Sequence, residues 1–114
     1  MNLTIYHNPR CSKSRQTLEI LRQNGREPVI VEYLKTPPDA AALKDLLSRL
    51  RLTARDVLRT GEALYRELEL AGETSEDKLI AAIAAHPILL ERPIVVSGKR
   101  AVIGRPPEKV LELL

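Results

Sequence analysis

The order strand, helix, strand at the start of this 114-residue chain constrains its fold more than any other feature. A short apolar strand is predicted over residues 3–6, a helix over about 12–24, and a second, buried-type strand over 28–33. Asn24 and Gly25 are expected to end the helix, because they readily adopt the left-handed conformation at which helices stop. Two strands joined through a helix should run parallel, with a right-handed crossover.

The middle of the chain is predicted to be helical. Thr36 is expected to cap the first of these helices and Pro37 to be its first residue, where a missing N–H costs nothing. Leucines then recur at helical spacing within residues 43–50. Further helices are predicted from Thr53, over residues 62–70, and from Thr74 up to His86-Pro87.

The last third of the chain returns to strands. Residues 93–97 and 100–103 are predicted to form an antiparallel hairpin with its turn at Gly98 and Lys99. A terminal helix is predicted after residues 104–107. Its apolar face should comprise Val110, Leu111 and Leu114.

This order, a β-α-β half, a helical insertion and a β-β-α half, is that of the thioredoxin-like fold. The sequence therefore predicts an α/β protein with a four-stranded mixed β-sheet flanked by helices, in a single domain over residues 1–114. In that fold a proline just before the third strand is commonly cis and faces a cysteine between the first strand and first helix. Pro93 and Cys11 occupy those two places.

Cys11 is the only cysteine, and it lies where the first predicted helix begins. Free backbone N–H groups and the helix dipole favour an anion there, and the thiolate is the reactive form of cysteine. Its flanks are polar and charged, including Lys13 and Arg15, which favours a reactive thiol over an inert buried one. One cysteine makes no internal disulfide, and it also leaves no second thiol to resolve a covalent intermediate.

Composition argues against several classes of function. The net charge is only +3, and the chain has no Phe, no Trp and three Tyr, so platforms for stacking bases are nearly absent and no nucleic-acid partner is expected. The longest apolar run is too short to cross a bilayer, and no signal peptide is recognisable, so we expect no membrane partner and a cytoplasmic location. His86 has no partner at metal-ligand spacing, and two histidines and one cysteine that do not cluster in the sequence argue against a zinc site.

Four stretches together are similar to a known family. They are residues 6–15 (YHNPRCSKSR), 86–89 (HPIL), 92–96 (RPIVV) and 104–108 (GRPPE). In this order, and over essentially the whole chain, they resemble the glutaredoxin-coupled arsenate reductases, the ArsC family. The Cys-Ser-Lys-Ser sequence at 11–14 is similar to that of one branch of the family.

The resemblance implies an oxidoreductase that reduces arsenate to arsenite in arsenic detoxification. In the family the cysteine, here Cys11, attacks arsenic and displaces water or hydroxide. The family's histidine, which is linked to lowering the pKa of the thiol, maps onto His7. Its three oxyanion-binding arginines map onto Arg59, Arg92 and Arg105.

The family also implies glutathione as a co-substrate, glutaredoxin as a protein partner, and no bound cofactor. Glutathione attacks the thiol-bound arsenic, and glutaredoxin resolves the mixed disulfide that remains. Two nearby side chains are further candidates for the oxyanion site. Asn8 can donate a hydrogen bond to the thiolate or the anion, or can close the turn, and Ser14 offers a donor in the first helical turn.

Two other functions are weighed against this one. A monothiol, glutathione-linked oxidoreductase of another substrate would use the arginines to bind the carboxylates of glutathione. Some thioredoxin-fold relatives instead regulate transcription through a Cys-x-x-Cys disulfide. The second cysteine of such a pair is replaced here by Ser14, so that switch is impossible in this chain.

Overall fold

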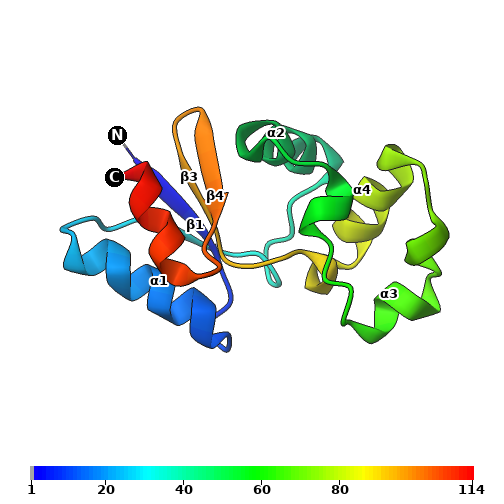
Figure 1. The fold of residues 1–114 in the computed structure, drawn as a ribbon, viewed down its shortest axis with the longest axis horizontal. Coiled ribbons are helices and arrows are strands. Elements are labelled where there is room, and N and C mark those ends of the chain that lie inside the picture. The colour runs from blue at the N-terminus through cyan, green and yellow to red at the C-terminus, as the bar shows by residue number, and fades with distance from the viewer. Residues whose placement is uncertain (1) are drawn as a thin grey trace. The chain divides into compact units, whose positions relative to one another are not determined.

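The computed structural model describes residues 2–114, so Met1 lies outside the described residues. The chain forms two compact units, coloured by residue number in Figure 1. The first, called here the sheet unit, contains residues 2–36 and Arg92–Leu114. The second, called the helical unit, is Pro37–Glu91 and corresponds to the predicted helical insertion.

The sheet unit contains a four-stranded mixed sheet. Its strands are β1 (Leu3–His7), β2 (Val29–Glu32), β3 (Ile94–Ser97) and β4 (Arg100–Ile103), in the order β2-β1-β3-β4. The parallel pairing of β1 with β2 and the antiparallel hairpin of β3 with β4 are both confirmed. β3 also pairs antiparallel with β1, which completes the thioredoxin-like arrangement.

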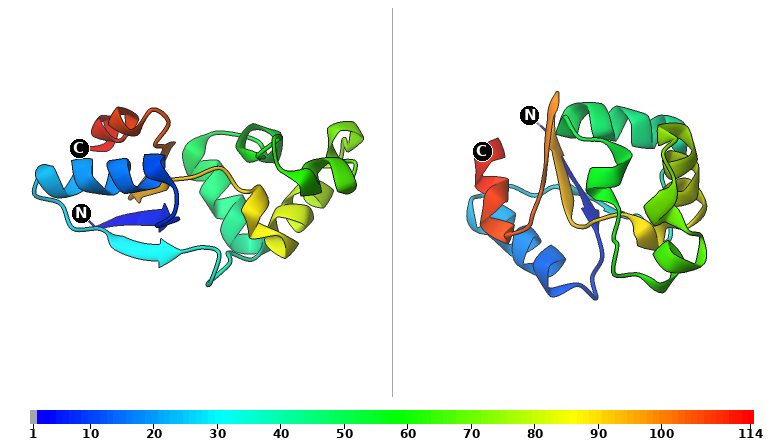
Figure 2. Two further views of the ribbon diagram at one scale, coloured as in Figure 1. Left: turned by 90° about the horizontal axis from the view of Figure 1, so that it is seen from below. Right: turned by 45° about the vertical axis from the view of Figure 1, so that its right-hand side comes forward.

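Helix α1 (Ser12–Gln23) and the 3₁₀ helix η4 (Pro107–Leu113) cover one face of this sheet (Figure 2, left). Side chains alternate between the faces of a strand, so every second residue of β1 points to this covered face. The buried residues of this core are Leu3, Ile5, Leu18, Leu21, Val95, Val110 and Leu113. His7 shares this alternation at the end of β1, which directs its side chain toward the start of α1.

The end of α1 agrees with its prediction. Gly25 takes a left-handed conformation with φ 74°. Its N–H donates to the Arg22 carbonyl at 3.0 Å, and the Arg26 N–H donates to the Leu21 carbonyl at 2.9 Å. This pair of bonds satisfies two carbonyls that the helix end would otherwise leave open.

The prediction that the second strand is buried is wrong. Val29 is 57% exposed and Ile30 is 40% exposed, because β2 is an edge strand with a single neighbour. A short apolar run has no periodicity that distinguishes a central strand from an edge strand.

The terminal segment is helical as predicted, but with a different inner face. Pro107, Val110 and Leu113 are buried, whereas the predicted Leu111 and Leu114 are exposed. The segment is a 3₁₀ helix, in which residues three apart lie directly above one another, so the apolar face repeats every three residues.

The helical unit contains three α-helices and three 3₁₀ helices within the described residues. They are α2 (Ala40–Leu50), η1 (Ala54–Val57), α3 (Ala63–Glu67), η2 (Leu70–Gly72), α4 (Glu76–Ala85) and η3 (Pro87–Leu89). The helix predicted over residues 62–70 is shorter than expected, since Glu69 adopts a left-handed conformation with φ 55° and separates α3 from η2.

The predicted start of α2 is also wrong. The cap is Asp39, whose carboxylate accepts the Ala42 N–H at 2.8 Å, rather than Thr36. Pro38 disfavours helical geometry at Pro37, so the helix cannot begin at the first of the two prolines.

None of the helices formed by residues 2–114 combines the length and the apolar character needed to cross a membrane.

Candidate active site

Cys11 is the N-cap residue of α1, with the extended backbone typical of that position (φ −93°, ψ 122°). Its N–H donates to the Asn8 carbonyl at 3.0 Å, and its own carbonyl accepts the Arg15 N–H at 3.0 Å. The residue is only 8% exposed. The chain thus turns directly from β1 into α1 and holds the thiol against the free N–H groups of the first helical turn.

The pKa of the Cys11 thiol lies below its ordinary value. Burial raises this pKa, but the backbone N–H groups of Ser14 and Lys13 and the positive charges of Arg92 and Arg105 lower it by more. Hydrogen bonds and cations both favour the thiolate over the thiol. Two of the three predicted oxyanion-binding arginines therefore act electrostatically on the sulfur.

Arg92 and Arg105 are linked to each other as well as to Cys11. Nη1 of Arg105 donates to the Arg92 carbonyl at 3.1 Å. The peptide bond that follows each arginine is cis: at Pro93, where a cis bond is expected, and at Pro106, where none is predicted. The two guanidinium groups thus extend from the start of β3 and from just beyond the end of β4.

Gly104 lies in a crowded place between these arginines and α1. A Cβ atom there would lie 2.6 Å from Oγ1 of Thr17 and 2.9 Å from Cγ of Pro93. Thr17 is fully buried, and its hydroxyl donates to the Lys13 carbonyl at 2.8 Å, so it has little freedom to move away. The absence of a side chain at Gly104 allows the chain before Arg105 to pack against α1.

His7 pairs with Ser14 rather than with the thiol. Its Nδ1 lies 2.6 Å from Oγ of Ser14, and both residues are buried. Burial lowers the pKa of His7, Glu32 raises it, and Arg22 and Arg15 lower it, so the imidazole is neutral at neutral pH. We assign the proton to Nε2, which lets the Ser14 hydroxyl donate to Nδ1.

Ser14 supports the turn in two ways. Its Oγ also accepts the Asn8 N–H at 3.0 Å, so the hydroxyl is engaged on both sides and is fully buried. Its backbone N–H is one of the groups that stabilise the Cys11 thiolate. The side chain of Ser14 thus fixes the loop before the helix, and its role in anion binding stays a prediction.

The side chain of Asn8 closes the turn. Its Oδ1 accepts the Arg10 N–H at 3.0 Å, which is the Asx-type bond by which asparagine shapes loops. Nη1 of Arg15 donates to the Pro9 carbonyl at 2.9 Å and holds the same loop from the helix side.

Arg59, the third predicted arginine, belongs to the helical unit. Its guanidinium forms ion pairs with Glu62 and, at 3.8 Å, with Glu91. The backbone N–H of Arg59 donates to the Leu89 carbonyl at 2.8 Å. These contacts fix Arg59 within its own unit, and its part in oxyanion binding stays a prediction.

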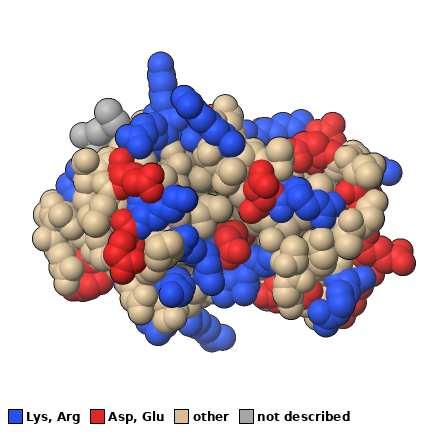
Figure 3. All heavy atoms as spheres, in the orientation of Figure 1, with Lys and Arg blue, Asp and Glu red and all other residues tan. Residues whose placement is uncertain are grey.

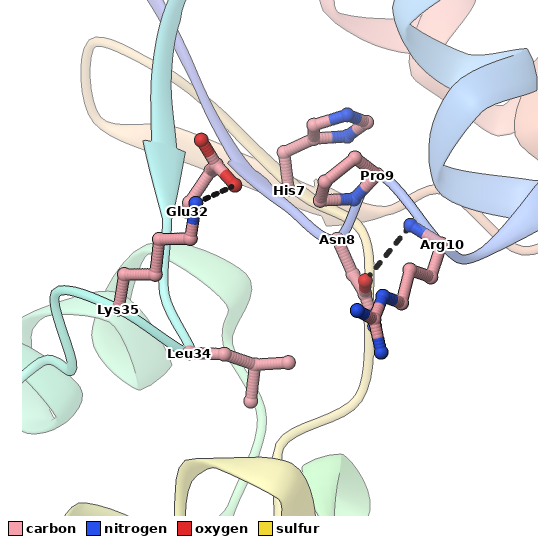
Figure 4. A pocket seen from close by; sticks show the side chains of 7 residues that line it. All are labelled: His7, Asn8, Pro9, Arg10, Glu32, Leu34 and Lys35. Carbon is pink, nitrogen blue, oxygen red and sulfur yellow. Dashed lines mark hydrogen bonds and ion pairs between the residues drawn. The ribbon is translucent and has the colours of Figure 1, made fainter.

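A pocket of about 240 Å³ lies within the sheet unit, beside the turn formed by residues 8–11, which is called here the Cys11 turn. Figure 4 shows the residues that line it, with the end of β2 on one side and the loop before Cys11 on the other: His7, Asn8, Pro9, Arg10, Glu32, Leu34 and Lys35. Sequence reasoning missed Glu32 and Lys35. The parallel pairing was the available signal, because ligands bind outside the carboxyl ends of parallel strands, where β1 and β2 both end.

Basic and acidic side chains are interspersed over the face shown in Figure 3, with Lys and Arg lying between Asp and Glu. This mixture fits the small net charge of +3. The electrostatic effect on Cys11 therefore comes from individual arginines placed near the sulfur.

Known proteins are similar to this chain over nearly its whole length. The sequence pattern of the ArsC family matches residues 6–113. The chain is 57% identical to the uncharacterised protein YfgD of Escherichia coli (strain K12), over 96% of this chain and 94% of that protein. It is 46% identical to an arsenate reductase of Neisseria meningitidis, over 98% of this chain and 97% of that protein.

Solved structures give the same likeness in three dimensions. The structure of an arsenate reductase from Vibrio cholerae superimposes with a TM-score of 0.97 at 50% sequence identity. The match covers 100% of this chain and 98% of that one, so the likeness extends across both units as well as the loop around Cys11.

Proposed function

This chain belongs to the ArsC family, and we propose that it is a glutathione- and glutaredoxin-dependent arsenate reductase with Cys11 as its nucleophile. The feature that carries the proposal is the position of Cys11 as N-cap of α1, where helix N–H groups and the charges of Arg92 and Arg105 lower the pKa of its thiol. Arginine pairs bidentately with oxyanions, and a helix N-terminus favours negative charge.

In the first step the Cys11 thiolate attacks arsenic. A sulfur–arsenic bond forms while one arsenic–oxygen bond breaks, and the departing oxygen takes up protons and leaves as water. Arg92 and Arg105 would hold the remaining oxygens by charge-assisted hydrogen bonds, and the Ser14 and Lys13 N–H groups would face the sulfur. Arg59 is proposed as a third cation for this anion.

In the second step glutathione attacks the thiol-bound arsenic adduct. A disulfide forms between Cys11 and glutathione, and the electron pair of the sulfur–arsenic bond stays on arsenic, so As(V) becomes As(III) while two thiols are oxidised. Glutaredoxin then reduces the mixed disulfide and restores Cys11. An external thiol is required because the chain has no other cysteine.

The test is arsenate-dependent NADPH oxidation in the presence of glutathione, glutaredoxin and glutathione reductase. We expect sustained turnover by the wild type and none by Cys11→Ser. Arg92→Ala and Arg105→Ala should each weaken arsenate binding while the protein stays folded by circular dichroism. Absence of turnover by a folded protein whose Cys11 is still readily glutathionylated would overturn the proposal.

A second candidate is a monothiol, glutathione-linked oxidoreductase of another substrate. It is favoured by the 57% identity to a relative whose activity is not described by its name, compared with 46% to a named arsenate reductase. Reduction of a glutathionylated model disulfide, with arsenate omitted, distinguishes the two. Fast reduction without any arsenate turnover would support this second candidate.

A further inference from the structure

The pocket beside the Cys11 turn is lined by charges of both signs. Arg10 stands on the loop side, while Glu32 and Lys35 stand on the β2 side, and Leu34 and Pro9 add apolar surface (Figure 4). Glu32 and Lys35 form an ion pair at 3.5 Å, with their side chains 41% and 78% exposed. Such an exposed pair contributes little and exchanges readily for other partners.

The size of the pocket limits its ligand. At about 240 Å³ it is smaller than the roughly 300–1,000 Å³ usual for a drug-sized molecule, so it takes a group about as large as one amino acid. Two cations, one carboxylate and a neutral imidazole leave it with a single net positive charge. The Glu32 carboxylate would repel a bare oxyanion, and the cations of Arg10 and Lys35 would repel a polyamine.

The pocket and the thiol belong to one turn of the chain. Arg10 directly precedes Cys11, and the carbonyl of Asn8 accepts the Cys11 N–H at 3.0 Å. A group bound between Arg10 and Glu32 therefore lies next to the loop that leads into Cys11, although Cys11 itself does not line the pocket. In glutathione the γ-glutamyl group is bonded directly to the cysteinyl residue, so a site for the first holds the second close by.

We propose that this pocket binds the zwitterionic α-amino-acid head of the thiol co-substrate, the γ-glutamyl group of glutathione. This inference rests on the proposed function. Arg10 and Lys35 bind the α-carboxylate, and Glu32 binds the α-ammonium group after Lys35 turns from it to the carboxylate. The cysteinyl sulfur of the bound peptide is then held on the Cys11 side of the pocket.

Binding is tested first without any reaction. S-methylglutathione has no free thiol and forms no disulfide, and its titration into the full ¹⁵N-labelled protein is followed by the amide signals of Asn8, Arg10 and Lys35. We expect these signals to shift saturably. The S-methyl form of cysteinylglycine, which lacks the γ-glutamyl head, should leave them in place, and free glutamate separates a general amino-acid site from one for the thiol peptide.

Kinetics with two thiols test the same contacts. Glu32→Gln and Arg10→Gln should each raise KM for glutathione about tenfold, the equivalent of one lost charge-assisted contact, with little change in kcat. Turnover with cysteinylglycine should be the same in the wild type and both variants. Glu112→Gln and Lys109→Gln, which change exposed charges on η4, are the matched controls and should keep the wild-type KM.

The two arms separate this inference from the proposed function. Saturable shifts with S-methylglutathione but no arsenate turnover would reject the reductase and retain the pocket. Arsenate turnover with no shifts, and an unchanged KM for glutathione in both variants, would overturn the pocket and retain the reductase. Equal shifts with the headless peptide would also overturn it, since the γ-glutamyl group would then contribute nothing.

Discussion

At the scale of single residues, two opposed effects of its surroundings set the pKa of the Cys11 thiol. Burial alone would make the thiol less acidic, and the helix N–H groups with Arg92 and Arg105 reverse that effect. His7 pairs with the Ser14 hydroxyl, and the Ser14 backbone N–H lowers the pKa of the thiol. The role of His7 in tuning the thiol, which the family resemblance implies, stays a prediction.

We expect the thiolate absorbance of Cys11 to titrate at a lower pH than that of an ordinary free cysteine, whose pKa is about 8.5. Arg92→Ala and Arg105→Ala should each raise this pKa, because each removes a cation that favours the thiolate. Since the folded pKa is the lower one, the stability that ionisation of Cys11 contributes is complete above the unfolded pKa. That contribution is lost as pH falls through the folded pKa. An ordinary pKa in the wild type would contradict the assignment.

Replacing Ser14 tests the buried hydroxyl. Ser14→Ala leaves His7 Nδ1 and the Asn8 N–H without their present partner, and should lower the free energy of unfolding by about 1–3 kcal/mol. Urea unfolding measures this loss. Ser12→Ala, at an exposed position of the same helical turn, is the control and should change stability much less. Equal effects of the two substitutions would refute the role given to the Ser14 hydroxyl.

At the scale of elements, the contact of Thr17 with Gly104 joins α1 to the segment after β4. The Thr17 hydroxyl lies 3.5 Å from the Gly104 carbonyl, which is 87 residues away in sequence. This close approach places Arg105 where its charge reaches Cys11. The position of that cation therefore depends on the packing of two elements as much as on the residue itself.

Gly104→Ala should destabilise the fold by about 1–3 kcal/mol, since its Cβ would overlap Thr17 and Pro93. Thermal unfolding monitored by circular dichroism measures the change. Adding Thr17→Ala should restore part of the loss by removing the nearest atom. Gly61→Ala is the matched control, because no atom lies within 4 Å of its Cβ. A Gly104→Ala variant as stable as this control would contradict the close packing.

At the scale of the whole molecule, the single cysteine dictates how a catalytic cycle can close. Cys11 provides one thiol, and the reduction of arsenate to arsenite consumes two. The second must come from another molecule, which is why a binding site for a thiol peptide beside Cys11 matters to the proposed cycle.

Arsenite formation should therefore stop without an added thiol. With arsenate and the reduced protein alone, we expect less than one arsenite per chain, measured by separating arsenic species chromatographically. Adding glutathione and glutaredoxin should give many turnovers per chain. Repeated turnover by the protein alone would show that the electrons come from elsewhere.

The order of elements, the place of Cys11 at a helix start and the need for an external thiol can all be read from the amino-acid sequence. These follow from periodicity, local stop signals such as Asn24-Gly25, and a count of cysteines, none of which requires distant segments to meet. The resemblance added the arginines; Arg92 and Arg105 lower the pKa of the thiol, and their binding of an oxyanion stays a prediction. Local patterns were less reliable at element ends, as the cap at Asp39 illustrates.

Which side chains meet depends on the tertiary fold. The burial of Ser14 against His7, the contact of Thr17 with Gly104, and the position of the Glu32–Lys35 pair across the pocket from Arg10 depend on how α1, β2 and β4 pack. The exposure of β2 was decided in the same way, because an apolar run fits an edge strand and a central strand alike. Contacts between residues far apart in sequence leave no mark on local periodicity, and for that reason the sequence alone did not reveal them.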